Sequence, residues 1–431
     1  MKSIFFFHRI AILLSLSLII NLADALDVST YQPIEDASLN LTGEQDHATI
    51  AATDTGVAFI AWHADAESTD AGLHPIFGRL YDIHSGTFSS LPFLLDYTTD
   101  EEQWVPDVET DLSNAYFIIA WSSNVISTGY NSYFRIIDYD GYPVIPATFD
   151  ERLQVNKFTS DKRIYPDVDV YDNGDFVIAW DEVRDGEMNY FVRVIKPSTH
   201  SMGQICKINS LPVAQPPSHS YGIPDVSVNQ SGGAAVVWEN VGTDSVSISL
   251  TLINPYNCKV HGEIDVDPSD GIQRRPVIDI NDSGVAIVGW TEIEGTTLGE
   301  ENALPSRVFI KKLYYSTDGI SSSNRIEVTQ DPPGKQRLPV VLLRPEGASV
   351  VSWATDDLFL RIFNKNLIPL TDPLLINGEA TDFSQTRPAF SLVDGPSLYD
   401  DPLIPLSWES TDETGRIFIQ TKVLSISGVS Q

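Results

Sequence analysis

The sequence predicts an all-β protein built from seven copies of one four-stranded antiparallel unit. Three observations lead to this prediction: a phrase that recurs along the chain, the even spacing of its tryptophans, and the strand pattern within each copy. The chain has 431 residues, of which 42% are hydrophobic and 10% aromatic, so it can bury a core. Seven such units in tandem, without helical periodicity, predict a seven-bladed β-propeller.

The recurring phrase begins with a proline and a short apolar run, passes through a turn that ends in glycine, and closes with four or five apolar residues and a tryptophan. The seven closing tryptophans are Trp62, Trp121, Trp180, Trp238, Trp290, Trp353 and Trp408. Successive members lie 52 to 63 residues apart, and the first copy, from Ala48, lacks the proline. We expect these side chains to pack between neighbouring blades. Trp104 stands outside the repeat and is the candidate for an exposed aromatic.

The third copy shows how the strands of one blade follow each other. Residues 167–171 alternate between apolar and polar, and Asp172-Asn173-Gly174 is a hairpin turn signal. Residues 176–180 are nearly continuously apolar, which predicts a strand buried on both faces. A third strand is expected at 190–195 and a fourth at 205–208.

Ring closure is expected to join the two ends of the repeat array. The seventh copy supplies only three strands, the last at 416–425, whereas residues 38–42 resemble 153–156, a fourth strand in the second copy. We therefore expect an N-terminal strand, within 38–42, to complete the last blade. Such closure pairs backbone groups that would otherwise form an open edge.

The first 25 residues have the pattern of a signal peptide. Lys2 and Arg9 precede an apolar stretch, and Ala23-Asp24-Ala25 fits the cleavage signature. A membrane anchor is the alternative interpretation. The sequence thus predicts a signal peptide over 1–25 and one propeller domain over 26–431, secreted and extracellular, monomeric, with no membrane span after cleavage.

Charge and cysteine content exclude several classes of protein. The chain carries 59 acidic against 27 basic side chains, a formal charge of −32, which repels a nucleic-acid backbone. Two cysteines exclude a disulfide scaffold, a zinc-ribbon array and an iron–sulfur protein.

The repeat phrase resembles one found in large bacterial exported proteins. The resemblance rests on Pro-Asp-Val, a later Gly, Phe-Val-Ile-Ala-Trp, and Asp-Gly before the fourth strand, as at Asp140-Gly141. It covers all seven copies and is best in the second, third and fourth. It implies propeller blades and export, and it supplies no catalytic residues.

Acidic residues recur at two positions of the repeat. Three aspartates follow the repeat proline: Asp107, Asp167 and Asp225. Four acidic residues come one or two positions after the tryptophan: Asp181, Glu239, Glu292 and Glu409. Propeller topology brings the start of the first strand and the end of the second to the same face, so we expect both groups around one mouth of the channel.

Two interpretations of these acids remain open. They form an acidic funnel for Ca²⁺ or a cationic partner, or each aspartate accepts N–H groups of its own loop while each glutamate is solvated. The second is favoured, because a repeated residue usually serves the blade. We therefore expect no cofactor, with Ca²⁺ as the one option.

Arginines precede the repeat proline by one to three residues, at Arg163, Arg275, Arg337 and Arg387. An arginine cluster would suit a carboxylate ligand, as in sialidases, which are propellers with acidic and tyrosine partners. The box of that family is absent, and bridging between blades is the favoured role. No metal-binding histidine spacing or nucleophile elbow is present.

The leading hypothesis is a secreted binding or scaffold module for a protein or glycan ligand. The alternative is a propeller glycoside hydrolase of sialidase-like type at the acidic, arginine-bearing mouth; a non-enzymatic role is favoured. A disulfide is expected between Cys206 and Cys258, at the rims of the third and fourth blades. Two free thiols are the alternative, since adjacent rims diverge. Three glycosylation sequons occur: Asn229 and Asn281 in or beside hairpin turns, and the less favourably placed Asn40.

Overall fold

The computed structural model describes most of the chain after the predicted signal peptide. The described residues are 27–39, 41, 43–64, 74–96, 101–111, 116–125, 129–146, 151–162, 164–210, 213–214, 223–242, 245–269, 271–294, 305–316, 319–329, 335–378, 385–393 and 402–427. The predicted signal peptide, Asn40 and Arg163 lie outside them. Among the described residues, no helix is long and apolar enough to cross a membrane.

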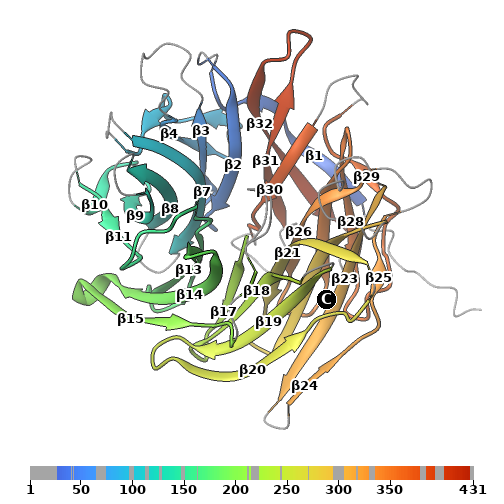
Figure 1. Cartoon of the computed structure of the whole chain (residues 1–431). Coiled ribbons are helices and arrows are strands. Elements are labelled where there is room, and N and C mark those ends of the chain that lie inside the picture. The colour runs from blue at the N-terminus through green and yellow to red at the C-terminus, as the bar shows by residue number, and fades with distance from the viewer. Residues whose placement is uncertain are drawn as a thin grey trace, which may run out of the picture.

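Seven antiparallel sheets stand around a central channel as the blades of a propeller (Figure 1). The strands of the first blade are β2 (Gln45–Ala52), β3 (Val57–Ala64), β4 (Ile76–Asp82) and β5 (Thr87–Phe88), with β6 (Phe93–Leu94). Those of the second blade are β7 (Glu101–Asp111), β8 (Tyr116–Val125), β9 (Gly129–Asp138) and β10 (Pro143–Ile145), with β11 (Leu153–Gln154). Those of the third are β12 (Asp167–Val170), β13 (Phe176–Arg184), β14 (Glu187–Lys196) and β15 (Ser201–Lys207), with β16 (Val213–Ala214).

The remaining four blades repeat this order. The fourth contains β17 (Asp225–Asn229), β18 (Gly233–Val241), β19 (Val246–Asn254) and β20 (Lys259–Asp265). The fifth contains β21 (Ile272–Ile280), β22 (Val285–Ile293), β23 (Ser306–Ser316) and β24 (Gly319–Ser322), with β25 (Ile326–Glu327). The sixth contains β26 (Arg337–Leu343), β27 (Ser349–Ala354), β28 (Leu358–Phe363) and β29 (Leu374–Leu375), and the seventh β30 (Gln385–Phe390), β31 (Leu403–Thr411), β32 (Ile417–Ser427) and β1 (Asp27–Asp36).

The strand pattern predicted for the third copy is confirmed, with one shifted boundary. Strand β13 is buried from Phe176 to Val183, as expected for a strand covered on both faces. The turn before it closes with a bond from the Gly174 N–H to the Tyr171 carbonyl (2.9 Å), and Gly174 has a φ of 79° that suits glycine. The fourth strand begins at Ser201, four residues before the expected start, because a turn at Pro197–Thr199 ends sooner.

The repeated tryptophans are structural, as the sequence predicted. All seven are at most 2% exposed. In the third blade the Trp180 ring lies 5.7 Å from Phe191 of the same blade and packs in one cluster with Phe134 and Ile136 of the preceding blade. The buried tryptophan therefore packs between two adjacent sheets and contributes to the apolar contact that holds the blades together.

The ring is closed by an N-terminal strand, but not by the one expected. Strand β1, blue in Figure 1, pairs with β32, red, from Asp27 opposite Ser427 to Asp36 opposite Gln420. The expectation of a strand within 38–42 is wrong. The Asp36 carboxylate accepts the N–H groups of Ser38 (2.8 Å) and Leu39 (3.2 Å), and this turn ends the pairing.

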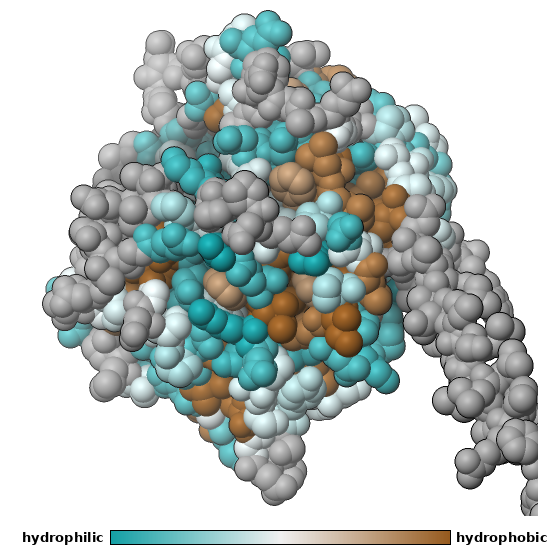
Figure 2. Space-filling view, turned by 90° about the vertical axis from the view of Figure 1, so that its right-hand side faces the viewer, coloured by the Kyte–Doolittle hydropathy of each residue, from teal (hydrophilic) through white to brown (hydrophobic). Residues whose placement is uncertain are grey.

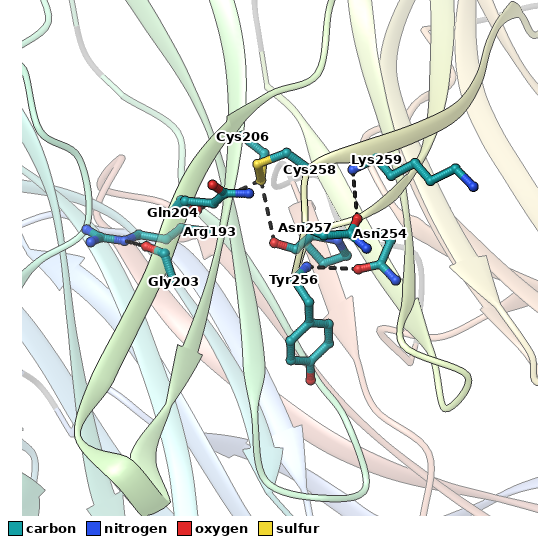
Figure 3. Close-up of a disulfide and its surroundings, with 10 residues drawn as sticks. Arg193, Gly203, Gln204, Cys206, Asn254, Tyr256, Asn257, Cys258 and Lys259 are labelled. Atoms are coloured by element: carbon teal, nitrogen blue, oxygen red, sulfur yellow. Dashed lines mark hydrogen bonds between the residues drawn. A yellow bond between two sulfur atoms is a disulfide. The ribbon is translucent and has the colours of Figure 1, made fainter.

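The two cysteines form the expected disulfide between the third and fourth blades (Figure 3). Cys206 lies in β15, and Cys258 lies in the turn before β20, with 5.2 Å between their Cα atoms. Cys206 is buried at 1% exposure, beneath the turn that carries Cys258 and Tyr256. The bridge therefore ties the outer strands of two adjacent blades.

Removal of this bridge should destabilise the ring without opening it. A Cys206→Ser/Cys258→Ser variant is expected to lose about 2–4 kcal/mol in the free energy of unfolding, the usual effect of a native disulfide. Urea unfolding measures this loss, and the mass increase of two hydrogens on reduction of the parent protein confirms the bond. An unchanged midpoint would contradict a stabilising role.

The closing strand should be essential and replaceable in trans. A variant that lacks residues 27–36 leaves the edge of β32 unpaired, and we expect a much lower melting temperature. A synthetic peptide with the sequence of Asp27–Asp36 should restore part of the loss, whereas the same peptide with Thr30→Pro should restore less, because proline lacks the N–H of the ladder. Equal melting of the deleted and parent proteins would refute this closure.

Candidate functional site

One end of the channel is surrounded by the residues that precede the repeat proline, or Ala48 in the first copy. We call these seven positions the entrance row: His47, Val105, Tyr165, Ile223, Arg275, Leu338 and Arg387. Six are partly exposed and Tyr165 is 9% exposed, whereas the following proline or alanine is buried. The row therefore combines three apolar side chains with one histidine, one tyrosine and two arginines.

Five entrance-row residues adopt left-handed backbone conformations. The φ angles are 53° at His47, 43° at Val105, 55° at Arg275, 55° at Leu338 and 49° at Arg387. At each of these residues the register between the innermost strand and the second strand shifts, as in a β-bulge. Non-glycine residues seldom adopt this conformation, and bulges redirect side chains beside functional sites.

Beneath the entrance row, the channel encloses a cavity of about 400 Å³. The middle row of side chains in it consists of Thr49, Asp107, Asp167, Asp225, Val277, Val340 and Ala389. The lower row consists of Glu109, Asp169, Ser227, Asp279, Leu342 and Ser391. The carboxyls all come from the second to fifth blades, so the channel is acidic on one side and apolar or hydroxyl-bearing on the other.

The aspartates that follow the repeat proline bind the next blade. Asp107 accepts the Val168 N–H (2.9 Å), and Asp167 accepts the Val226 N–H (2.7 Å). Asp225 likewise accepts the N–H of Ile278. The expectation that each aspartate serves its own loop is therefore wrong, because the free N–H groups nearest to it lie on the inner edge of the neighbouring sheet.

Burial in the channel raises the pKa of its carboxyl groups. The pKa rises to about 6 at Asp107 and Asp169 and to about 7 at Asp279, in each case chiefly because burial disfavours the charged form. Burial and neighbouring carboxylates also raise the pKa of Asp167 well above its ordinary value. The channel thus carries less negative charge near neutral pH than its composition implies.

The acids that directly follow the tryptophans support the entrance row from beneath. Asp181 accepts the N–H of Tyr165 (2.7 Å) in its own blade. Glu239 and Glu409, one methylene longer, reach the next blade. Glu239 accepts the N–H of Arg275 (2.8 Å), and Glu409 that of His47 (2.7 Å). All three acids are at most 5% exposed, so the expectation that the glutamates are merely solvated is wrong.

The seventh and first blades meet in a polar cluster around Arg387. Its guanidinium bonds to the Asp46 carboxylate, to Glu409 Oε1 (2.9 Å) and to His47 Nδ1 (2.9 Å). Burial raises the pKa of Glu409 to about 8 against the opposing charge of Arg387. At Asp46 burial also favours the neutral acid, but hydrogen bonds with Glu409 and His47 prevail and lower the pKa. The surroundings therefore drive the pKa values of the two carboxyls apart, upward at Glu409 and downward at Asp46.

Metal-ligand spacing occurs in the same cluster. Histidine, cysteine, aspartate and glutamate side chains can bind a metal ion. Within the described part of the chain, Asp46, His47 and His63 are the one group of three such side chains whose ligand atoms lie within 4.8 Å of one another. The Arg387 guanidinium bonds to both Asp46 and His47 Nδ1 and so provides the positive charge at this point. The donor set is therefore already occupied by an internal cation, and binding of Ca²⁺ stays a prediction.

Arg275 differs from Arg387 in its surroundings. The adjacent Arg274 forms the ion pair with Glu239, through its Nε (3.1 Å). The pKa of Arg275 is lowered to about 10, chiefly by burial and also by the positive charges of Arg387 and Arg274. The negative charge of Glu239 acts in the opposite direction. Tyr165 also acts electrostatically on Arg275, which places side chains from the third, fifth and seventh blades around one mouth.

Two other residues singled out in the sequence are not among those that line the cavity. Glu292 accepts bonds from Arg325 (2.6 Å) and Ser269 (3.0 Å), at the connection between the fourth and fifth blades. Trp104 packs in strand β7 against His74, with 3.8 Å between ring centroids, and beside His63 (5.1 Å). Trp104 is therefore a packed residue and not an exposed aromatic.

Sequence reasoning found two polar members of the entrance row, Arg275 and Arg387, and missed His47 and Tyr165. The signal was present, because all four stand directly before the proline position of their repeat. His47 was overlooked since its copy has Ala48 in place of proline.

The sequons differ in their surroundings. Asn229 is partly exposed and accepts the Gly233 N–H (3.1 Å). Asn281 is 9% exposed, and its amide nitrogen donates to the Pro345 carbonyl (3.3 Å), so glycosylation there would break this bond. Asn229 is thus the better acceptor of the two.

Stability should fall as the pH rises through the range in which the channel acids titrate. In the folded protein Asp107, Asp169 and Asp279 have raised pKa values, so between about pH 4 and pH 7 the folded state binds more protons than the unfolded chain. Their stabilising contribution is complete below their unfolded pKa and is lost through about pH 6 to 7. We expect a higher melting temperature at pH 5 than at pH 8.

Asp279→Asn should raise the melting temperature at pH 8 and flatten this dependence, because asparagine keeps an acceptor for the Leu343 N–H without the charge. Asp140→Asn, at an exposed turn, is the control and should change neither. A parent protein that is more stable at pH 8 than at pH 5 would contradict the titration of these groups.

Comparison with known proteins identifies the fold. No family model and no curated protein matches the sequence. A protein of unknown function from Dyadobacter fermentans DSM 18053 is similar in structure, with a TM-score of 0.55 and 10% identity over 93% of this chain and 99% of that one. A PL25 ulvan lyase bound to -[GlcA(1-4)Rha3S]- has a TM-score of 0.55 and 8% identity, over 89% and 94%. Kuenenia stuttgartiensis hydrazine synthase has a TM-score of 0.51 and 10% identity, over 88% and 97%. These similarities show a shared propeller fold.

Proposed function

We propose that this protein is an exported β-propeller that binds a glycan at the entrance row of its channel. The observation that carries the proposal is the loss of seven-fold repetition at this row. His47, Tyr165, Arg275 and Arg387 stand where other blades place Val105, Ile223 and Leu338. A position that serves only the blade keeps one residue type, whereas a binding site gathers unlike residues at one place.

The construction of the row supports this interpretation. The bulges hold His47, Arg275 and Arg387 in uncommon backbone conformations, and buried carboxylates fix the backbone N–H groups of His47 and Arg275. Such support keeps polar side chains in place before a ligand arrives, which reduces the entropy lost on binding.

A glycan fits the surface better than a protein partner does. Large apolar side chains with more than 40% exposure are scattered over several blades: Tyr31, Leu39, Leu91, Tyr142, Phe158, Val260, Tyr314, Ile368 and Leu370. Figure 2 shows, on one side of the ring, apolar groups separated by hydrophilic ones. A stable protein interface would call for a continuous apolar centre. A concave mouth with several hydrogen-bonding groups suits a sugar.

The structural neighbours agree with a glycan ligand without identifying one. The ulvan lyase shares the fold over 94% of its length, and its structure is bound to the saccharide -[GlcA(1-4)Rha3S]-. Hydrazine synthase shares the fold and has an unrelated name and chemistry, so the fold alone does not select a ligand.

A second candidate, an enzyme that cleaves the bound glycan, is favoured by one observation. Glu409 and Asp46 form a carboxyl pair whose pKa values are driven apart, and the protonated member, Glu409, lies against the entrance row. A carboxyl group that keeps its proton near neutral pH can act as a general acid. In the non-enzymatic proposal the same pair only holds Arg387 and His47.

Binding at the entrance row is tested by blocking it. Ile223→Trp places a large ring at a partly exposed entrance position, and Leu91→Trp makes a comparable change at an exposed position in the loop between β5 and β6. On a glycan array, with and without Ca²⁺, we expect the parent and Leu91→Trp to bind the same glycans and Ile223→Trp to lose them. Glycan binding that survives Ile223→Trp would refute this site.

Incubation of a bound glycan with the protein separates the two candidates. The binding proposal expects no new reducing ends and no unsaturated product. Product formation by the parent that disappears in Glu409→Gln, while binding persists, would establish the enzyme instead. Glutamine retains an acceptor for the His47 N–H, so this variant removes the carboxyl proton of Glu409 and keeps the hydrogen bond.

A further inference from the structure

One charged group of the entrance row, the guanidinium of Arg275, has no partner among the residues that the structure describes. Its backbone N–H is bonded to Glu239. Among the residues that the structure describes, however, no hydrogen bond or ion pair reaches its side chain. A guanidinium carries five N–H donors in a planar fork, and no described residue accepts from any of those of Arg275.

The lack of a partner follows from how the fourth and fifth blades meet. Glu239 is fully buried and bonds at once to the Arg274 Nε (3.1 Å) and to the Arg275 backbone N–H (2.8 Å). Arg274 lies inside the interface and takes the ion pair. Arg275 itself lies at the left-handed bulge, and its guanidinium is within electrostatic range of Tyr165 and Arg387, two other members of the entrance row.

Arg387 shows the opposite arrangement at the same row. Its Nη1 is bonded to Asp46, Glu409 and His47, so this guanidinium is paired with residues of the seventh and first blades. The two arginines therefore differ in role: Arg387 holds the seventh blade to the first, whereas Arg275 is available to a ligand.

The surroundings of Arg275 disfavour a lone cation. It is partly buried, and burial together with the charges of Arg387 and Arg274 destabilises its charged form, although it stays protonated at neutral pH. An anion bound at the mouth would relieve the desolvation and the repulsion at the same time. This is the environment in which a charge-assisted hydrogen bond contributes most to affinity.

We infer that Arg275 binds the carboxylate of an acidic sugar, an inference that rests on the glycan-binding function proposed above. The planar fork of arginine matches a carboxylate through two parallel hydrogen bonds. The acidic channel below prevents the anion from going deeper, so the carboxylate stays level with the entrance row. A net charge of −32 also disfavours densely charged polymers, so the ligand carries isolated carboxylates.

Paired probes that differ only in charge test this inference. Oligosaccharides ending in glucuronate or galacturonate are titrated calorimetrically, each beside a twin whose carboxyl has been reduced to an alcohol. We expect the parent to bind the acidic probe about 10- to 100-fold more tightly than its twin, the range for a charged hydrogen-bonding pair. Arg275→Ala should bind both twins with the same weak affinity, and Arg275→Lys should recover part of the difference because it keeps the charge without the fork.

Matched variants separate a failure of this inference from a failure of the proposed function. Arg344→Ala, at the turn between β26 and β27 at the opposite end of the innermost strand, should discriminate between the twins as the parent does. Melting curves of the three arginine variants confirm folding. If the parent binds both twins equally and Ile223→Trp abolishes both, Arg275 is not the anchor, although the glycan site stands. If no probe binds the parent, or if binding survives Ile223→Trp, the proposed function itself is refuted.

Discussion

The joining of the second to sixth blades depends on the way one blade satisfies the polar edge of the next. The innermost strand of a blade has one side without a partner strand, and its N–H groups must be bonded elsewhere. The channel aspartates provide that bond: Asp107 serves the third blade, Asp167 the fourth and Asp225 the fifth. The lower row makes the same kind of contact, because Asp169 accepts the Val228 N–H and Asp279 accepts the Leu343 N–H.

A second set of contacts joins the blades near their outer edges. In six blades a third-strand side chain donates to a carbonyl at the end of the preceding blade. These pairs are Arg79 to Ala37, Arg193 to Val155, Thr251 to Ile208, Lys311 to Val266, Arg361 to Val328 and Lys422 to Ile376. Carboxyl groups of the second to fifth blades therefore join blades at the channel, and basic side chains or, in the fourth blade, Thr251 join them farther out. The tryptophans fill the space between.

These contacts explain how far the sequence could predict the fold. The repeat phrase contains the buried tryptophan and its apolar strand, which is enough for the blade count and for closure by an N-terminal strand. It does not fix the register of the closing strand. Residues 38–42 share a short pattern with 153–156, but the residue equivalent to Val155 is Ala37, as the bond from its N–H to the Ile419 carbonyl shows. Partners nearly 400 residues apart in the chain are not visible in a local pattern.

The site was less predictable than the fold for a comparable reason. A residue before proline is expected to be extended, yet Arg275 and Arg387 are left-handed. The bulge moves them to the mouth and leaves the following residues one row deeper, so the predicted ring of aspartates lies inside the channel. The acids after the tryptophans then occupy the space below the bulges. Side-chain length decides their reach: Asp181 stays within its blade, whereas Glu239 and Glu409 extend to the next.

The same difference of one methylene bears on where a ligand can bind. Because Glu239 reaches into the fifth blade, it meets two consecutive arginines, and its ion pair is with the first of them, Arg274. Glu409 reaches the first blade, where Asp46 supplies a further carboxylate, and Arg387 pairs with both acids. The same type of contact, a glutamate that reaches the next blade, thus leaves Arg387 paired with carboxylates and the Arg275 guanidinium without a partner among the described residues. The body of the protein repels anions at a distance, while the entrance row attracts one at contact. This combination favours a ligand with few negative charges. A polymer with many anionic groups would be repelled along its whole length and would gain only one ion pair.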